Sequence, residues 1–219
     1  MILFILYIAS LLFSAVSAVI NYKYLKSRRL FIFIPYLILL FIQELGVYLY
    51  YLEDPTRSTA LVYNIYRPVT ACFFAYLYYK VSFNVAFRKV IIILVTSYLT
   101  AFVIVFTRVQ SIYTYNNYLN LAGGLVITCC AIFFLFNYFK LDNPVEEKKW
   151  LPLLWITIGV VSFYPVVNIS FTLYWQLQSY NNSTVGGVKI HQIIPRVMSI
   201  FMYGCFAWAF YLCRKKNSI

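Results

Sequence analysis

The stretch that decides the fold is LFIFIPYLILLFIQELGVYLYYLEDPTRSTALVYNIYRPVTACFFAYLYYKV, which runs from Leu30 to Val81. It contains two apolar runs joined by a short polar link around Asp54. Each run is long enough for the ~20 residues that an α-helix needs to cross a bilayer. A helix rises roughly 1.5 Å per residue, so Glu44 in the first run and Arg67 in the second would lie ~10 Å below the same membrane face. The stretch therefore predicts a transmembrane hairpin with one charged residue in each helix.

The composition of the whole chain also indicates that lipid surrounds it. The 219 residues are 63% hydrophobic and only 11% charged, with a mean hydropathy of +0.78. Soluble domains carry about 25% charged residues. The net charge of +12 comes from basic residues that lie between apolar runs, which indicates membrane topology and no nucleic-acid partner. We therefore expect an all-α integral membrane protein.

The apolar runs predict one domain over residues 1–219, a bundle of seven transmembrane helices. Their expected ranges are 2–20, 30–51, 60–81, 90–108, 118–139, 150–175 and 193–213. The end of the first run, at Ala15–Ala18, resembles a signal-peptidase site, so a cleaved signal peptide is the alternative for that run. Cleavage would leave the basic cluster from Lys23 to Arg29 outside, which favours a retained helix.

The basic residues also predict the orientation of the bundle. With seven spans, 13 of the 18 Lys and Arg residues fall on one side of the membrane. The other five are Arg57, Arg67, Arg108, Lys189 and Arg196. Because basic residues gather on the cytoplasmic side, we expect a multi-pass cell-membrane protein with its N-terminus outside and its C-terminus in the cytoplasm.

Polar residues gather in the expected outer half of the bundle, where we place a ligand-binding site. The candidate residues are Glu44, Asn64, Arg67, Asn120, Asn168, His191 and Arg196. A charge near the bilayer centre costs ~2.5–3.5 kcal/mol on insertion scales, so Glu44 is expected to face the bundle, with Arg67 or Arg196 as its partner. Three interpretations stay open: a structural ion pair, the floor of a pocket that opens outward, and part of a translocation path. The excess of arginine favours a small anionic or polar ligand from the outer side. The polar loop at 176–192 is a candidate cover for such a pocket.

The sequence gives little support to catalysis. The two aspartates, Asp54 and Asp142, fall in expected loops, and His191 is the one histidine, so metal sites lack ligands. We expect no catalytic residue, metal or cofactor. If the chain were an enzyme, it would be an intramembrane peptidase that combines Cys72 or Cys205 with His191 and an arginine. We keep this interpretation as the second alternative to a non-enzymatic function.

The interpretation that best fits the sequence is a non-enzymatic membrane sensor or accessory subunit. No output domain is attached to the bundle, so signalling would need a separate cytoplasmic or membrane partner protein, while basic segments contact the lipid bilayer. The first alternative is a small-solute transporter. Seven helices in a chain of this length resemble the small sugar permeases, yet Ile34-Pro35-Tyr36 and Ile194-Pro195-Arg196 stand where that family has a Pro-Gln motif. No permease site residue is therefore transferred to this chain.

Overall fold

The computed structural model describes residues 2–54, 58–82, 84–141, 144–178, 184–185 and 188–215. The described chain is helical apart from links and one two-stranded antiparallel pair. The elements are α1 (Ile2–Ile20), α2 (Tyr22–Ser27), α3 (Phe33–Glu53), α4 (Ala60–Val81), α5 (Val85–Ile104), the π-helix η1 (Val105–Val109), α6 (Asn117–Tyr138), α7 (Pro144–Gln178), β1 (Thr184–Val185), β2 (Val188–Lys189) and α8 (Ile190–Lys215).

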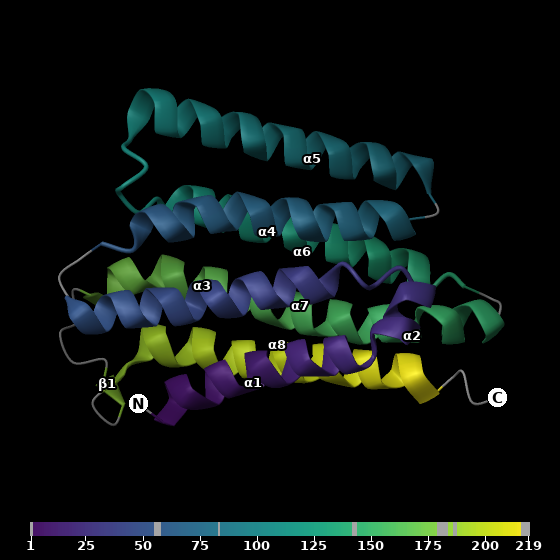
Figure 1. Cartoon of the computed structure of the whole chain (residues 1–219). Helices are drawn as coiled ribbons and strands as arrows, with labels where there is room; N and C mark the ends of the chain where they lie inside the picture. Colours follow the sequence, from purple (N-terminus) through teal and green to yellow (C-terminus); the bar gives the residue numbers. More distant parts are fainter. Residues whose placement is uncertain are drawn as a thin grey trace.

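The long helices lie side by side and alternate in direction along the chain (Figure 1). One end of the bundle holds the start of α1, the α3–α4 and α5–α6 links and the strands (Figure 1). We call it the N-terminal end. The opposite end holds α2, the α4–α5 and α6–α7 links and the last turn of α8, and we call it the C-terminal end. The two termini therefore lie at opposite ends of the molecule.

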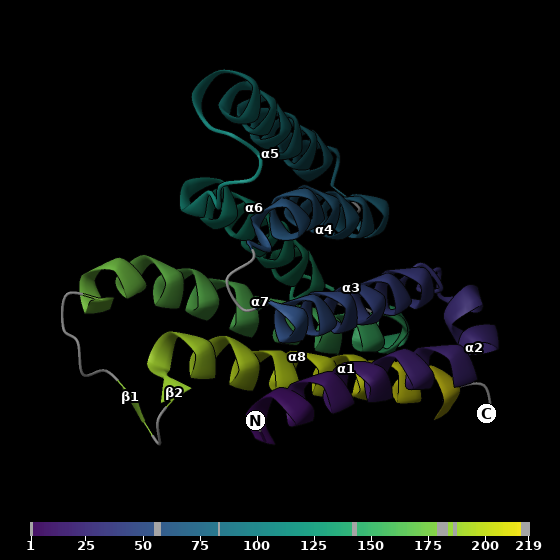
Figure 2. The same ribbon diagram turned by 60° about the vertical axis from the view of Figure 1, so that its left-hand side comes forward.

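The contacts of α1, α3, α4, α6, α7 and α8 arrange these helices in a ring, and α5 lies outside it, beyond α4 and α6 (Figure 2). Around the ring, α3 packs on α1, α1 on α8, α8 on α7, α7 on α6, and α6 on α4. Aromatic side chains close the ring between α3 and α4: the rings of Tyr36 and Phe73 stack with centroids 4.0 Å apart. The ring of Phe33 meets Phe73 edge-on at 5.1 Å. Helix α5 packs against α4 and α6 from outside.

Among the described residues, length and composition identify six helices that can cross a membrane: α1, α3, α5 with η1, α6, most of α7, and α8. The chain is thus a helical, multi-pass membrane protein. Helix α4 has 22 residues, as many as α6, but it contains Asn64, Arg67 and Thr70, which lower its hydropathy. The crossing of α4, and with it the number seven, stays a prediction.

The observed helix bounds differ from the expected ones at several ends, and at the starts of α5 and α6 an asparagine side chain caps the backbone. Helices α1 and α4 have the expected bounds, while α3 is shifted to Phe33–Glu53. Helix α5 begins five residues early, at Val85, because the Asn84 side chain accepts a hydrogen bond from the Ala86 N–H at 2.8 Å. Helices α7 and α8 extend beyond the expected 150–175 and 193–213 at both ends.

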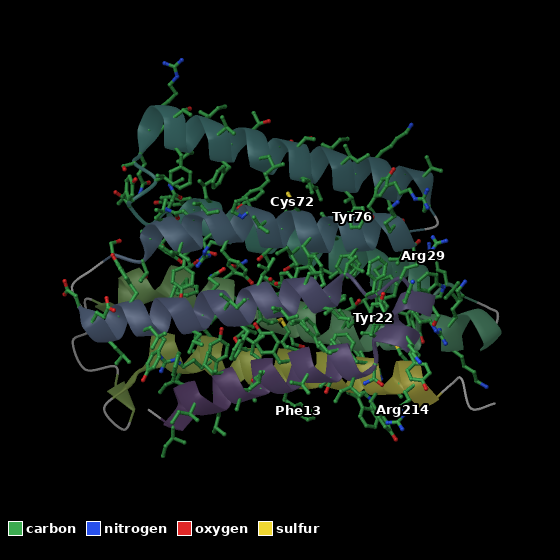
Figure 3. All side chains as sticks on the ribbon, in the orientation of Figure 1. Phe13, Tyr22, Arg29, Cys72, Tyr76 and Arg214 are labelled. Carbon is green, nitrogen blue, oxygen red and sulfur yellow. The ribbon has the colours of Figure 1, made fainter. Side chains whose placement is uncertain are left out.

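A short helix that the sequence analysis did not expect follows α1. The segment Tyr22–Ser27 forms α2, which ends with Arg29 in the left-handed region at φ 60°. The Leu30 N–H donates to the Leu25 carbonyl at 2.9 Å, which completes a C-cap of the Schellman type. This turn reverses the chain before α3. Arg29 and Arg214 lie at the C-terminal end of the bundle (Figure 3).

Candidate functional site

A cavity of about 500 Å³ lies inside the ring of six helices. Its lining comes from α1, from residues 36–44 of α3, 63–70 of α4, 120–127 of α6, 163–171 of α7 and 195–203 of α8, together with Thr59 and Tyr115. On α4 the lining residues Tyr63, Tyr66, Arg67 and Thr70 recur at helical spacing, so they share one face. On α1, α4, α6, α7 and α8 these residues lie mainly in the half of the helix nearer the N-terminal end of the bundle, whereas on α3 they lie in its first half, which starts at the C-terminal end. The cavity therefore extends from the part of the ring near the N-terminal end into its middle.

The structure brings five of the seven candidate residues together around this cavity: Glu44, Arg67, Asn120, Asn168 and Arg196. Asn64 is buried beside the cavity but does not line it, because its amide donates to the carbonyls of Ile112 at 2.8 Å and Thr114 at 2.9 Å. His191 lies in the first turn of α8, and its side chain is outside the described residues. Ligand binding by these residues stays a prediction.

Arg67 is held by aromatic groups. Its guanidinium donates to the hydroxyl of Tyr115 and lies over the rings of Tyr115, at 5.0 Å, and Phe171, at 5.9 Å. The Nε atom of Arg67 is buried and has no hydrogen-bond partner among the described residues. These contacts fix the guanidinium in position without neutralising its charge.

The expected ion pair of Glu44 does not form. Among the described residues, the Glu44 carboxylate has neither the Arg67 nor the Arg196 guanidinium within the 4.0 Å of an ion pair. Glu44 interacts with the Tyr7 hydroxyl and, at longer range, with Arg196. The Arg196 guanidinium lies over the ring of Phe4 at 5.5 Å. The cavity therefore has two separate polar regions, because Glu44 and Arg196 lie beside α1 whereas Arg67 is held between Tyr115 and α7.

The link between η1 and α6, residues 110–116, covers part of the cavity, a role that sequence reasoning did not assign to it. Gln110 donates to the Thr114 carbonyl at 3.1 Å, and the Asn116 amide donates to the Gln110 side-chain oxygen at 2.7 Å. Together with the bonds from Asn64, these contacts place Tyr115 beside Arg67. Sequence reasoning placed a cover at 176–192, of which residues 179–183 and 186–187 lie outside the described residues.

Tyr115 connects two polar side chains of the site. Its hydroxyl oxygen accepts from Arg67 and from the Asn120 amide, the latter at 3.1 Å. Burial raises the pKa of Tyr115, although the neighbouring Arg67 charge opposes that rise. The hydroxyl therefore keeps its proton near neutral pH, and since its oxygen already accepts two hydrogen bonds, that proton is available to a further acceptor.

A second cavity, of about 530 Å³, adjoins the first. Both cavities are lined by Tyr115, Asn120, Asn168 and Phe171. The second is otherwise lined by Gln110, by the first residues of α6 and by Thr172. These four side chains therefore form a shared wall between the two cavities.

Gly124 makes room for one member of this wall. A Cβ atom built on Gly124 would lie 2.4 Å from Nδ2 and 2.6 Å from Oδ1 of Asn168. Real Cβ atoms do not approach other atoms this closely. The absence of a side chain at Gly124 thus allows the Asn168 amide to reach the cavity and donate to the Leu121 carbonyl at 3.4 Å.

Towards the C-terminal end the cavity gives way to packed aromatic side chains. The hydroxyls of Tyr36 and Tyr66 lie 3.1 Å apart at this inner boundary. Beyond them the ring of Phe33 meets Phe206 at 5.5 Å and Phe210 at 5.8 Å, and all three side chains are fully buried. The cavity is thus closed on this side.

Two observations bear on the chemistry and relationships of the site. Within the described ranges, no group of three or more His, Cys, Asp or Glu side chains could hold a metal ion. Comparison of the chain with models of protein families, with curated proteins and with solved structures finds no match in any of the three.

Proposed function

We propose that this chain is a seven-span cell-membrane protein that binds a small polar ligand from the outer side and acts as a sensor or accessory subunit. The observation that carries the proposal is a cavity inside the helix ring that collects polar side chains from five helices and is closed by aromatic packing towards the C-terminal end. Pockets with an apolar lining and a few convergent polar groups are typical ligand sites. A partner protein would carry the output, because the described chain is a bundle of membrane helices.

Two features support binding over catalysis. The polar groups of the site come from Glu44, Arg67 and Arg196 with three asparagines nearby, a set that provides hydrogen bonds and charge but no activated nucleophile. On five of the six ring helices, the residues that line the cavity also lie mainly in the half that the distribution of basic residues predicts to be outside. These features suit recognition of a ligand that arrives from the outer side.

A labelling experiment tests the side and the manner of access. Ser199 lines the cavity on α8, so we place a single cysteine there, Ser199→Cys, in a background without the five native cysteines. The reagent is the small membrane-impermeant anion 2-sulfonatoethyl methanethiosulfonate, applied from either side of sealed vesicles. Ser170→Cys, a buried serine of α7 that does not line the cavity, is the matched control.

The proposal predicts that Ser199→Cys reacts from the outer side alone, while Ser170→Cys stays unreacted. Reaction from both sides would indicate alternating access and hence a transporter. Reaction from the cytoplasmic side alone, or equal reaction of the two variants, would contradict the proposed function.

A further inference from the structure

The charge balance of the cavity differs between its two polar regions. On the side of α1, Glu44 lies within electrostatic range of Arg196, so that region contains an acidic as well as a basic group. On the side of α7, Arg67 interacts with tyrosines, and no carboxylate among the described residues forms an ion pair with it. A cation inside a membrane bundle is costly unless it is paired. The Arg67 region therefore has one unbalanced positive charge.

The free hydrogen-bonding groups of this region are donors. The Arg67 guanidinium donates one hydrogen bond among the described residues, from Nη2 to Tyr115, and its remaining N–H groups have no partner there. The Tyr115 hydroxyl accepts two hydrogen bonds, so its own proton is the group that remains to be donated. Two donors beside one cation match a carboxylate, which accepts hydrogen bonds on both oxygens and has a single negative charge. A doubly charged phosphate would exceed that charge and would face Glu44 across the same cavity.

Much of the rest of the cavity wall is aromatic, which indicates that the apolar part of the ligand contains a ring. Ten of the 25 lining residues are Phe or Tyr, and they surround Arg67 as well as the inner boundary. Aromatic rings favour stacked or edge-on contacts with other rings, which add to the gain from the area buried. A cavity of about 500 Å³ also exceeds what an acetate-sized anion fills.

We propose that the ligand of this site is a ring-bearing organic monoanion whose carboxylate is bound by the Arg67 guanidinium and the Tyr115 hydroxyl, with its apolar body between the aromatic side chains of the cavity. This inference rests on the proposed function and narrows its ligand to one chemical class. Asn120 is a positioning residue in this arrangement, because it donates to the Tyr115 hydroxyl and directs that proton into the cavity.

The test measures binding of three matched probes to the full chain in lipid nanodiscs by calorimetry. 2-Naphthoate has both the ring and the charge, 2-naphthamide has the ring without the charge, and acetate has the charge without the ring. Hydrogen bonds to charged groups are worth about 1.5–3 kcal/mol, so 2-naphthoate should bind roughly ten- to hundredfold more tightly than 2-naphthamide. Acetate should bind far more weakly than either.

Variants assign the charge preference to named groups. Arg67→Gln should remove the preference for 2-naphthoate over 2-naphthamide, and Tyr115→Phe, which keeps the ring, should reduce it several-fold. Arg108→Gln is the control, because Arg108 is an exposed arginine near the same end of the bundle, and it should leave all three affinities unchanged. Tyr115→Phe keeps the test decisive if Arg67→Gln does not fold.

Three results would overturn this inference: equal affinities for 2-naphthoate and 2-naphthamide, a charge preference that survives in both site variants, or no binding of 2-naphthoate at 10 mM, roughly the weakest affinity that such contacts would give. If Ser199→Cys is nevertheless labelled from the outer side, the proposed function stands and only the ligand class is wrong. If Ser199→Cys is not labelled from that side, the proposed function fails as well.

Discussion

At the scale of single residues, Arg67 shows how a membrane bundle accommodates a cation without an acid beside it. The faces of two aromatic rings and one hydroxyl surround the guanidinium. A cation over a desolvated ring face gains up to about 2 kcal/mol, which offsets part of the cost of burying the charge. The contacts determine where the guanidinium lies, and its charge remains available.

Gly124 and Asn168 give a prediction at the same scale. Gly124→Ala should force the Asn168 amide out of its position, and overpacking of this kind typically costs about 1–3 kcal/mol. The measurement is thermal unfolding in detergent. The double variant Gly124→Ala, Asn168→Ala removes the clashing amide, so it should recover most of the loss.

The matched control for this prediction is Gly46→Ala, because a Cβ atom at Gly46 of α3 meets nothing within 4 Å. Alanine is favoured over glycine inside a helix by about 0.5–1 kcal/mol, so this variant should be as stable as the wild type or more stable. Equal melting temperatures for Gly124→Ala and Gly46→Ala would show that the Asn168 amide moves aside at no cost.

At the scale of elements, the link of residues 110–116 is attached to α4 by two side chains, because Arg67 donates to the Tyr115 hydroxyl and Asn64 bonds the backbone of the link. Asn64 donates to two of its carbonyls, and Ser58, just before α4, contacts it through the Tyr113 carbonyl at 3.5 Å. The link is therefore held by polar contacts and not by apolar burial. Regions held in this way open locally at less cost than the helices that they connect.

Asn64→Ala should free this link. The change removes two buried hydrogen bonds of about 1 kcal/mol each, so amide hydrogen exchange of residues 110–116 should quicken roughly tenfold or more while α6 and α7 stay protected. Asn137→Ala is the control, because the Asn137 amide nitrogen is buried without a hydrogen-bond partner in the described structure. Unchanged exchange of the link in Asn64→Ala would mean that Asn64 does not hold it.

The comparison of expected and observed elements shows which local signals were sufficient. Runs of apolar residues correctly predicted α1 and α4, because hydropathy changes sharply at their ends. The early start of α5 depends on the Asn84 cap, and the turn after α2 on a left-handed Arg29, a conformation that favours glycine. Individual side chains set these bounds, so a count of apolar residues could not find them.

The site was predictable only in part, for a physical reason that concerns distance along the chain. Arg67 and Asn120 were identifiable because polar residues are conspicuous in apolar runs. Tyr115 was not, since one tyrosine among 22 has no distinguishing local signal and it meets Arg67 from a position 48 residues away. Likewise, no sequence pattern could show that Glu44 and Arg67 would lie in separate polar regions of one cavity.

At the scale of the whole molecule, the alternating helices make a prediction about topology. Ser58 and Asn84 are exposed and flank α4 at opposite ends of the bundle. In a background without native cysteines, Ser58→Cys should react with an impermeant maleimide on intact cells, and Asn84→Cys should react only after permeabilisation. Reaction of both on intact cells would show that α4 does not cross. Exchange of the two results would show that the orientation is inverted.

The wall shared by the two cavities has a kinetic consequence. It consists of four side chains, three of which form hydrogen bonds: Asn120 donates to the Tyr115 hydroxyl, and Asn168 donates to the Leu121 carbonyl. A ligand that crosses this wall requires rotation of side chains, whereas any route between the ring helices requires displacement of packed backbones. Side-chain rotations are orders of magnitude faster than collective helix motions. Residence times should therefore be short, so that occupancy of the site follows rapid changes in ligand concentration.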